Sequence, residues 1–157
     1  MMIRLSPVSI EQKPQLWNLL QQYLHEMTDY YTIETDAQGN YRYQYFDAYF
    51  SDPQRKACFI RDERAVIGFV LINPYSSIGE KPDFTMAEFY ISPMYRRQGL
   101  GMEAAAHILK TFHGHWEIKY CNQNTAAKRL WTKAAEPYHP AKCNLGDAET
   151  VLSFSTS

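Results

Sequence analysis

The sequence predicts an α/β protein with a central mixed β-sheet of about six to seven strands flanked by four helices. In the second half of the chain, strand and helix patterns alternate, which favours parallel pairing of the strands on either side of a helix. In the middle of the chain, two strand patterns flank a short polar turn, which predicts an antiparallel hairpin. Together these observations require a mixed sheet with helices on its faces.

The bulk properties predict one globular domain over residues 1–157, because no repeat or linker interrupts the chain. Hydrophobic residues make up 45% and charged residues 21%, which excludes a disordered chain. A net charge of −1 provides no basic field for nucleic acid or anionic membrane, and no apolar run is long enough to span a bilayer. We therefore expect neither as a partner, while a homodimer is left open.

The cysteines and histidines show no metal-ligand spacing, so we expect no metal site. Three cysteines are an odd number with no evident pairing, which favours free thiols. The first residues, MMIRLSPVSI, lack the apolar core of a signal peptide. We accordingly expect a location in the reducing cytoplasm.

Local patterns in the sequence predict the elements in order, beginning with a strand, two helices and a hairpin. Residues 3–8 form the first strand, and Ser9 caps a helix whose apolar residues recur at helical spacing from Leu16 to Met27. After a polar loop, residues 45–52 predict a short helix that stops before Pro53. The remaining elements are a hairpin over 56–73 turning at 62–64, a strand over 84–92, a helix over 100–112, a strand over 116–120, a helix capped by Asn124, and a strand over 149–155.

Two glycines, Gly99 and Gly101, lie at the start of the helix in the segment SPMYRRQGLGMEAAAHIL. Each glycine costs a helix roughly 1 kcal/mol relative to alanine, so a pair in one turn indicates a function. A helix N-terminus exposes unpaired N–H groups and the positive end of the dipole, and glycines without Cβ atoms let the main chain wrap a phosphate. Arg96, Arg97 and Gln98 add side-chain donors at its rim. The alternative is a tight strand-to-helix turn without a ligand.

The type of anion follows from the residues around the two glycines. No Gly-Lys-Ser/Thr sequence is present, which excludes a Walker loop. The run from Gly99 to Ala104 does satisfy the dinucleotide pattern G-x-G-x-x-A, with Glu117 about 20 residues further on. However, PMYRRQ separates the glycines from their strand, Glu117 falls at the start of the next strand, and too little chain follows for such a domain. An NAD-linked oxidoreductase is therefore a weaker alternative.

The segment YISPMYRRQGLG resembles the acetyl-coenzyme A signature of the GNAT superfamily of N-acetyltransferases, Arg/Gln-x-x-Gly-x-Gly/Ala. Arg96, Gly99 and Gly101 occupy its defining positions. Downstream, NTAAKRLW is similar to the second cofactor motif of that superfamily, Asn-x-x-Ala-x-x-Leu-Tyr, through Asn124, Ala127 and Leu130. The hairpin strand VIGFVLI is likewise typical of the superfamily.

The chain departs from that pattern at Trp131, which stands where tyrosine is usual, and at AAEPYHP, which replaces a common Gly-Phe. In this it resembles a poorly characterised branch of the superfamily. Indole does not titrate, so the departure leaves open a catalytically degenerate domain that binds an acyl-coenzyme A without turnover. Tyrosine's usual task of protonating the thiolate then needs another group, for which Tyr138 and Cys121 are the candidates.

The resemblance implies acetyl-coenzyme A as the acyl donor and direct attack by a primary amine of a small molecule or peptide within a ternary complex. It implies main-chain contacts from the strand before the glycine turn, in the manner of an added strand. By resemblance, the cofactor site comprises Phe89, Tyr90, Ile91, Arg96, Arg97, Gln98, Gly99, Leu100, Gly101, Met102, Asn124, Ala127 and Trp131.

Acetylation of an amine requires a base, because an alkyl amine with a pKa near ~10.4 is about 10³-fold short of its neutral form at pH 7. Glu88 is the candidate, since it lies on the strand where similar enzymes place a carboxylate facing the acceptor. The alternative is a surface carboxylate on a half-exposed strand. Strand alternation places Glu88 and Tyr90 on one face.

The acceptor site is expected in the first helix and the loop after it, where Tyr23, Glu26, Tyr30 and Tyr31 lie. This region is aromatic and acidic, which suits a cationic amine through cation–π contacts and carboxylates. The competing interpretation is that the tyrosines pack the domain and the acids are solvated. Further residues of the same character follow at Glu34, Tyr41, Tyr43, Tyr45 and Asp47.

Overall fold

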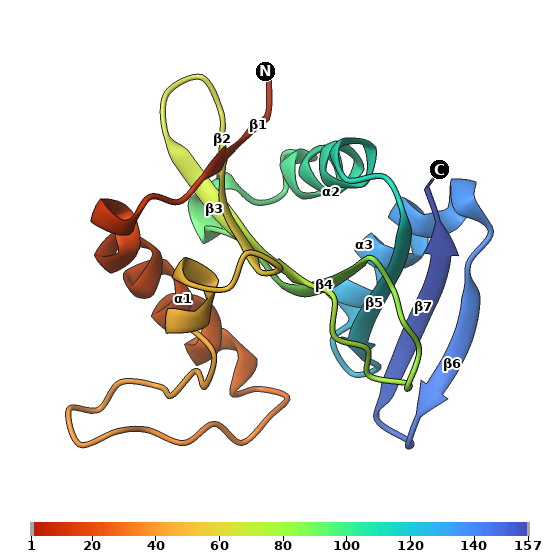
Figure 1. The fold of residues 1–157 in the computed structure, drawn as a ribbon, viewed down its shortest axis with the longest axis horizontal. Coiled ribbons are helices and arrows are strands. Elements are labelled where there is room, and N and C mark those ends of the chain that lie inside the picture. The colour runs from red at the N-terminus through yellow and green to blue at the C-terminus, as the bar shows by residue number, and fades with distance from the viewer. Residues whose placement is uncertain (1, 157) are drawn as a thin grey trace.

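The computed structural model describes residues 2–156 as a mixed seven-stranded sheet with helices on both faces (Figure 1). The strand order is β1-β2-β3-β4-β5-β7-β6. The strands are β1 (Arg4–Pro7), β2 (Lys56–Arg61), β3 (Val66–Asn73), β4 (Phe84–Ile91), β5 (His115–Cys121), β6 (Ala141–Leu145) and β7 (Glu149–Ser155). The α-helices among the described residues are α1 (Lys13–Met27), α2 (Leu100–Thr111) and α3 (Thr125–Ala135).

The sheet is mixed, as the sequence predicts. Strands β1 to β4 pair antiparallel in chain order, and β4 pairs parallel with β5 after the crossover through α2. Strand β7 then pairs antiparallel with β5 and with β6. No helix within residues 2–156 combines the length and the apolar character that crossing a membrane requires.

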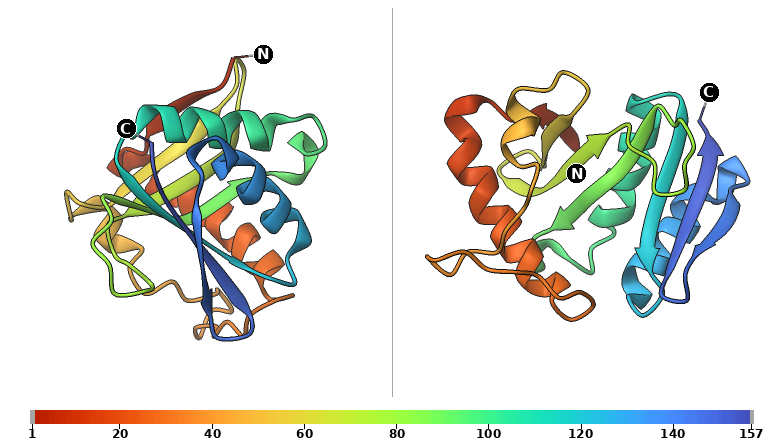
Figure 2. Two further views of the ribbon diagram at one scale, coloured as in Figure 1. Left: turned by 90° about the vertical axis from the view of Figure 1, so that its right-hand side faces the viewer. Right: turned by 60° about the horizontal axis from the view of Figure 1, so that its bottom comes forward.

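Helices cover both faces of the sheet (Figure 2), and a separate hydrophobic core lies on each face. Helix α1 buries Leu16, Leu20 and Leu24, which recur at helical spacing, against the face of β2–β4 that carries Phe59 and Phe69. Helices α2 and α3 pack on the other face, and their small alanines allow close contact with the strands. The halves of the sheet are covered unequally: α1 lies over the β1–β4 side only (Figure 2).

Three elements differ from the sequence expectations. The helix predicted over 45–52 is a single 3-10 turn, Asp47–Phe50, because Pro53 leaves too few residues for a costly helix nucleus. Ser9 caps a 3-10 turn, Ile10–Gln12, that leads into α1. Strand β6, AKCNL, was not predicted, since it is mostly exposed, has no alternation and forms by pairing with β7.

Strands β4 and β5 separate part-way along their length. They pair only at Phe84–Met86 with Trp116–Ile118, and beyond that point β4 stays with β3 while β5 stays with β7. The register between β3 and β4 shifts at the same place, so that Ala87 has no partner on β3. Such a bulge adds twist and bends the strand. A gap therefore opens beside Glu88, at the centre of the molecule.

Candidate active site

Glu88 lies at the point where β4 leaves β5, and two tyrosines hold its carboxylate. The hydroxyl of Tyr23, on α1, donates to Oε1 at 2.7 Å, and the hydroxyl of Tyr43, from the loop after α1, donates to Oε2 at 2.6 Å. Sequence alternation did not reveal this pair, because Tyr43 reaches Glu88 from a loop 45 residues earlier. Both oxygens are thereby fixed, and the side chain is half-buried.

Burial raises the pKa of the Glu88 carboxyl above its ordinary value of 4.5, and the hydrogen bonds from Tyr43 and Tyr23 together with the charge of Lys119 oppose that rise. Burial and the neighbouring carboxylate also raise the pKa of both tyrosines, so they remain neutral donors. A carboxylate with a raised pKa is a stronger base than a solvated one. Its chemistry is that of a proton acceptor.

Three cavities meet around Glu88, Tyr23 and Trp131. The central cavity, of about 330 Å³, is lined by both edges of the gap between β4 and β5. The turn-side cavity, of about 270 Å³, shares Tyr23 and Trp131 with it and extends to Gly101. The tyrosine-side cavity, of about 590 Å³, shares Glu88 and Lys119 with the central one and extends to Arg55. Glu88 therefore stands between a passage from the glycine turn and a separate polar cavity.

The glycine turn has the geometry of an anion cradle. Arg97 and Gly99 adopt positive φ angles of 62° and 77°, and Gly99 caps α2. The main-chain bond from Glu103 N to Gly99 O, 3.1 Å, is the first of the helix, so the preceding amides are the unpaired ones of its N-terminus. A Cβ atom at Gly101 would meet only Ile91 Cγ1, at 3.8 Å. The space over this turn therefore suits a phosphate.

Arg96 is exposed and lines the turn-side cavity together with Gly101, and its guanidinium also has partners within the protein. Its Nε donates to the carbonyl of Ile91 at 2.8 Å, and its Nη2 forms an ion pair with Glu26 at 2.8 Å. Its guanidinium also lies 5.4 Å from the ring centroid of Tyr90. The contacts join α1 to the end of β4. Glu26 consequently lines the turn-side cavity, away from the position expected of an acceptor residue.

The second motif forms one wall of the central cavity. The side chain of Asn124 accepts a hydrogen bond from Ala127 N at 3.1 Å and caps α3, so the residue lies at the gap. Trp131 is buried, and its ring meets Phe89 edge to face with centroids 5.0 Å apart. Cys121 lines the same cavity from β5. Trp131 thus supplies an apolar surface.

The comparisons with known proteins agree with this geometry. A family model described as the Acetyltransferase (GNAT) family matches residues 17–135. The chain belongs to the GNAT acetyltransferase family. None of the curated proteins matches it. The resemblance seen in the glycine turn and the second motif is thereby confirmed at the level of the family.

Solved GNAT structures share the whole fold at low sequence identity. An acetyltransferase from Thermus thermophilus is 18% identical with a TM-score of 0.66, over 99% of this chain and 97% of that chain. The GNAT domain of S. lividans PAT is 12% identical with a TM-score of 0.68, over 98% and 90%. The aminoglycoside acetyltransferase AAC(6')-Ib, in complex with parmomycin and acetyl-coenzyme A, is 10% identical with a TM-score of 0.72, over 99% and 94%.

The remaining predicted site residues of this GNAT domain are dispersed. Tyr31 donates to Glu149 Oε2 at 2.7 Å and lines the central cavity, whereas Tyr30 lines none of the three cavities. Tyr138 stacks on Phe154, with ring centroids 5.6 Å apart, and Phe154 pairs with Trp116 at the start of β5. Along β5, Trp116 is four residues, or about 13 Å, from Tyr120, which lines the central cavity. The structure therefore separates Tyr138 from Glu88.

Sequence reasoning missed the polar residues of the tyrosine-side cavity. Glu117 and Lys119 are two apart on β5, which places them on one face of the sheet, and that alternation was the available signal. Arg55 offers no signal, because it lies in a short loop before β2. The residues of this cavity that the acceptor prediction omitted are Arg55, Asn73, Tyr75, Ser77, Thr85, Glu117 and Lys119.

Proposed function

We propose that residues 1–157 form a single-domain, acetyl-coenzyme A-dependent N-acetyltransferase that acetylates a primary amine of a small molecule. The position of Glu88 carries this proposal, because it is the base candidate and it lines both the polar tyrosine-side cavity and the central cavity, which shares Tyr23 and Trp131 with the cavity that reaches the glycine turn. Donor and acceptor would enter from these two directions and meet at the gap. Free thiols at Cys58, Cys121 and Cys143 suit the cytoplasm that we propose for it.

The donor side fits the diphosphate and the pantetheine arm of coenzyme A. The amides before Glu103 and the positive end of α2 favour an anion, with Arg97 and Gln98 exposed beside them. Along the gap, β4 pairs with β3 only, so its other edge is free for an added strand from Glu88 to Ile91. Trp131 and Phe89 bound the passage between these two regions.

In the proposed reaction, Glu88 accepts the proton that the amine must lose, and Tyr23 and Tyr43 keep the carboxylate oriented. The amine nitrogen forms a bond to the acetyl carbonyl carbon, and the carbon–sulfur bond breaks. The electron pair leaves on the thiolate, whose pKa of about 8.5 makes it a fair leaving group. We assign the proton it then takes up to the Cys121 thiol or to water, because Cys121 lines the central cavity.

Release of coenzyme A thiol tests this function directly. With acetyl-coenzyme A and a panel of primary amines, we expect thiol release above the hydrolysis rate and an acetylated product of matching amount. Trp131 favours one competitor, a binding module, since an indole at this position supplies no titrating hydroxyl of its own. Tight coenzyme A binding with no thiol release from any amine would support that module instead.

Replacing Gly101 with valine is expected to weaken coenzyme A binding at least tenfold without unfolding the protein. A Cβ at this position would make an ordinary contact with Ile91 Cγ1 at 3.8 Å, and Gly101 and Ile91 both line the turn-side cavity, so the added methyl groups should take up space that the donor needs. Calorimetric titration with coenzyme A measures the affinity, and the circular dichroism spectrum checks the fold. Lys110→Val, exposed in the last turn of α2, controls for the weaker helix propensity of valine. Unchanged affinity for coenzyme A in Gly101→Val would show that the glycine turn does not bind it.

A further inference from the structure

The tyrosine-side cavity carries charges of both signs. Its carboxylates are those of Glu88 and Glu117, and its cations are Arg55 and Lys119. A volume of about 590 Å³ is within the usual range of small-molecule sites. The inference drawn from this cavity rests on the function proposed above, for which it would hold the acceptor.

Arg55 occupies the aromatic faces that would otherwise receive a cationic ligand. Its guanidinium carbon lies 4.6 Å from the ring centroid of Tyr45, 4.7 Å from that of Tyr75 and 5.4 Å from that of Tyr49. Its side chain is only 10% exposed, although both Tyr45 and Tyr75 are about half exposed. The cation–π sites of this region are therefore filled by a cation of the chain itself.

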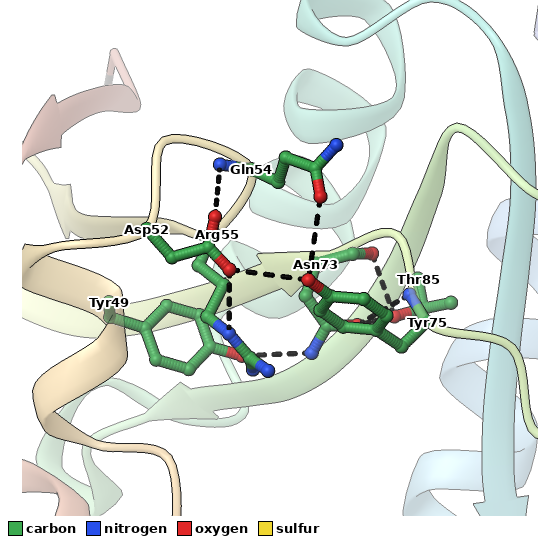
Figure 3. A network of polar contacts seen from close by, with 7 residues as sticks. All are labelled: Tyr49, Asp52, Gln54, Arg55, Asn73, Tyr75 and Thr85. Carbon is green, nitrogen blue, oxygen red and sulfur yellow. Dashed lines mark hydrogen bonds and ion pairs between the residues drawn. The ribbon is translucent and has the colours of Figure 1, made fainter.

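A polar network fixes the orientation of Arg55 (Figure 3). Asp52 Oδ2 pairs with its Nε at 3.3 Å, and the hydroxyl of Tyr75 donates to the same carboxylate oxygen at 3.2 Å. Asn73 donates to the hydroxyl of Tyr49 at 3.0 Å, and the outer nitrogens of Arg55 are drawn next to that hydroxyl (Figure 3). The ion pair thus engages the Nε edge of the guanidinium, and the outer nitrogens lie toward Tyr49 on the cavity wall.

Lys119, on β5, provides the second cation of the cavity. Its Nζ lies 3.7 Å from Glu149 Oε2, beyond hydrogen-bond distance, and its side chain is 42% exposed. Glu117, two residues earlier on the same face of β5, is already satisfied by the Ser76 hydroxyl and by Ser77 N at 3.1 Å. Lys119 is therefore available to a ligand, whereas Glu117 is not.

We propose that the tyrosine-side cavity binds a primary amine that also carries a carboxylate, with the amine beside Glu88 and the carboxylate toward Arg55 and Lys119. The guanidinium presents planar donors that match a carboxylate, and the ammonium adds a second charge. A ligand with several cationic groups is disfavoured, because Arg55 already occupies the tyrosine faces that would bind a cation. The chemical class is that of an amino acid or a related amino-carboxylate.

Calorimetric binding in the presence of coenzyme A tests this class without depending on turnover. The probes are the proteinogenic amino acids and the amines that differ from them only by loss of the carboxylate, such as phenylalanine with phenethylamine and lysine with cadaverine. We expect at least one amino acid to bind tenfold or more tightly than its decarboxylated partner. Equal or tighter binding of the decarboxylated amines, or binding by no member of the panel, would overturn the proposal.

Variants then locate the carboxylate contact. Arg55→Met is expected to weaken binding of that amino acid at least tenfold and to leave the decarboxylated partner unchanged, and Arg55→Lys should recover part of the loss. Lys119→Met, at a side chain that is 42% exposed, should weaken binding of the same ligand and provides the test if Arg55→Met fails to fold. Arg129→Met, on the exposed face of α3, is the matched control. If Arg55→Met and Lys119→Met both bind the amino acid with wild-type affinity, these two residues do not contact its carboxylate.

The two proposals fail in different ways. Selective binding of an amino-carboxylate without any release of thiol would remove the proposed reaction and leave the ligand class intact. Thiol release with decarboxylated amines at equal kcat/KM would preserve the reaction and refute the ligand class.

Discussion

Replacing Glu88 with glutamine is expected to lower kcat at neutral pH by about 100-fold or more, the usual contribution of a general base. Glutamine keeps the shape of the side chain; its carbonyl oxygen can still accept from one of Tyr23 and Tyr43, and its amide nitrogen can donate to the hydroxyl oxygen of the other, so the fold and the orientation of the site should persist. What is lost is the group that takes up the proton of the amine. The measurement is steady-state thiol release with the best acceptor from the amine panel.

The pH dependence of that loss distinguishes a base from a merely structural residue. Above about pH 11 an alkyl amine is largely neutral in solution, so the difference between wild type and Glu88→Gln should shrink as that pH is approached. Glu63→Gln, an exposed residue in the turn between β2 and β3, should show the wild-type profile. Equal kcat in Glu88→Gln and wild type at all pH values would clear Glu88 of this role.

The same variant should change the pH dependence of stability. Burial raises the pKa of Glu88 in the folded state above the ordinary 4.5, so the unfolded chain releases this proton first as the pH rises. The free energy of unfolding of the wild type therefore falls between pH 4.5 and the raised pKa. Glu88→Gln has no such proton and should lack this part of the decline in a denaturant titration series.

Replacing Gly68 with alanine is expected to destabilise the protein by about 3 kcal/mol, at the upper end of overpacking effects. A Cβ at this position on β3 would lie 1.8 Å from the carbonyl oxygen of Tyr90 and 2.9 Å from its carbonyl carbon. These are main-chain atoms of β4, so relief requires the two central strands to move apart. The melting temperature should fall by roughly 6–12 °C for a domain of this size.

We also expect Gly68→Ala to lose affinity for coenzyme A, since Tyr90 and Ile91 lie on the free edge of β4. Gly114→Ala is the matched control: its Cβ would meet the side chain of Asp83, with Oδ2 at 2.6 Å, and a side chain can rotate where a strand cannot. We expect Gly114→Ala to cost clearly less stability and to retain coenzyme A affinity. An unchanged melting temperature in Gly68→Ala would contradict the prediction, because it would show that β4 can shift at Tyr90 at little cost in free energy.

The sequence predicted those features that local patterns encode. Apolar residues at helical spacing marked α1, and the pair Gly99 and Gly101 marked the turn that begins α2, which we propose binds an anion. Strand alternation placed Glu88 on the face that α1 covers, where Tyr23 meets it. Each of these signals arises from residues within a few positions of one another, so the chain itself carries the information.

Features that depend on distant segments were not predictable. Arg55 meets Tyr45 and Tyr75 only because the loop before β2 and the loop after β3 come together in the fold. Arg96 fits the phosphate motif by its position, yet the nearness of α1 diverts it to Glu26. Strand β6 owes its existence to a partner strand rather than to its own residues.

The early divergence of β4 from β5 has a consequence for how a donor can be recognised. Peptide groups between Glu88 and Ile91 are identical whatever side chains they bear, so a ligand that pairs with them places no demand on residue identity. Phe89 and Tyr90 are consequently free to serve the interior, where one touches Trp131 and the other meets Phe69. Recognition through main-chain groups therefore leaves no motif in the sequence, and it can be identified only from the path of the backbone.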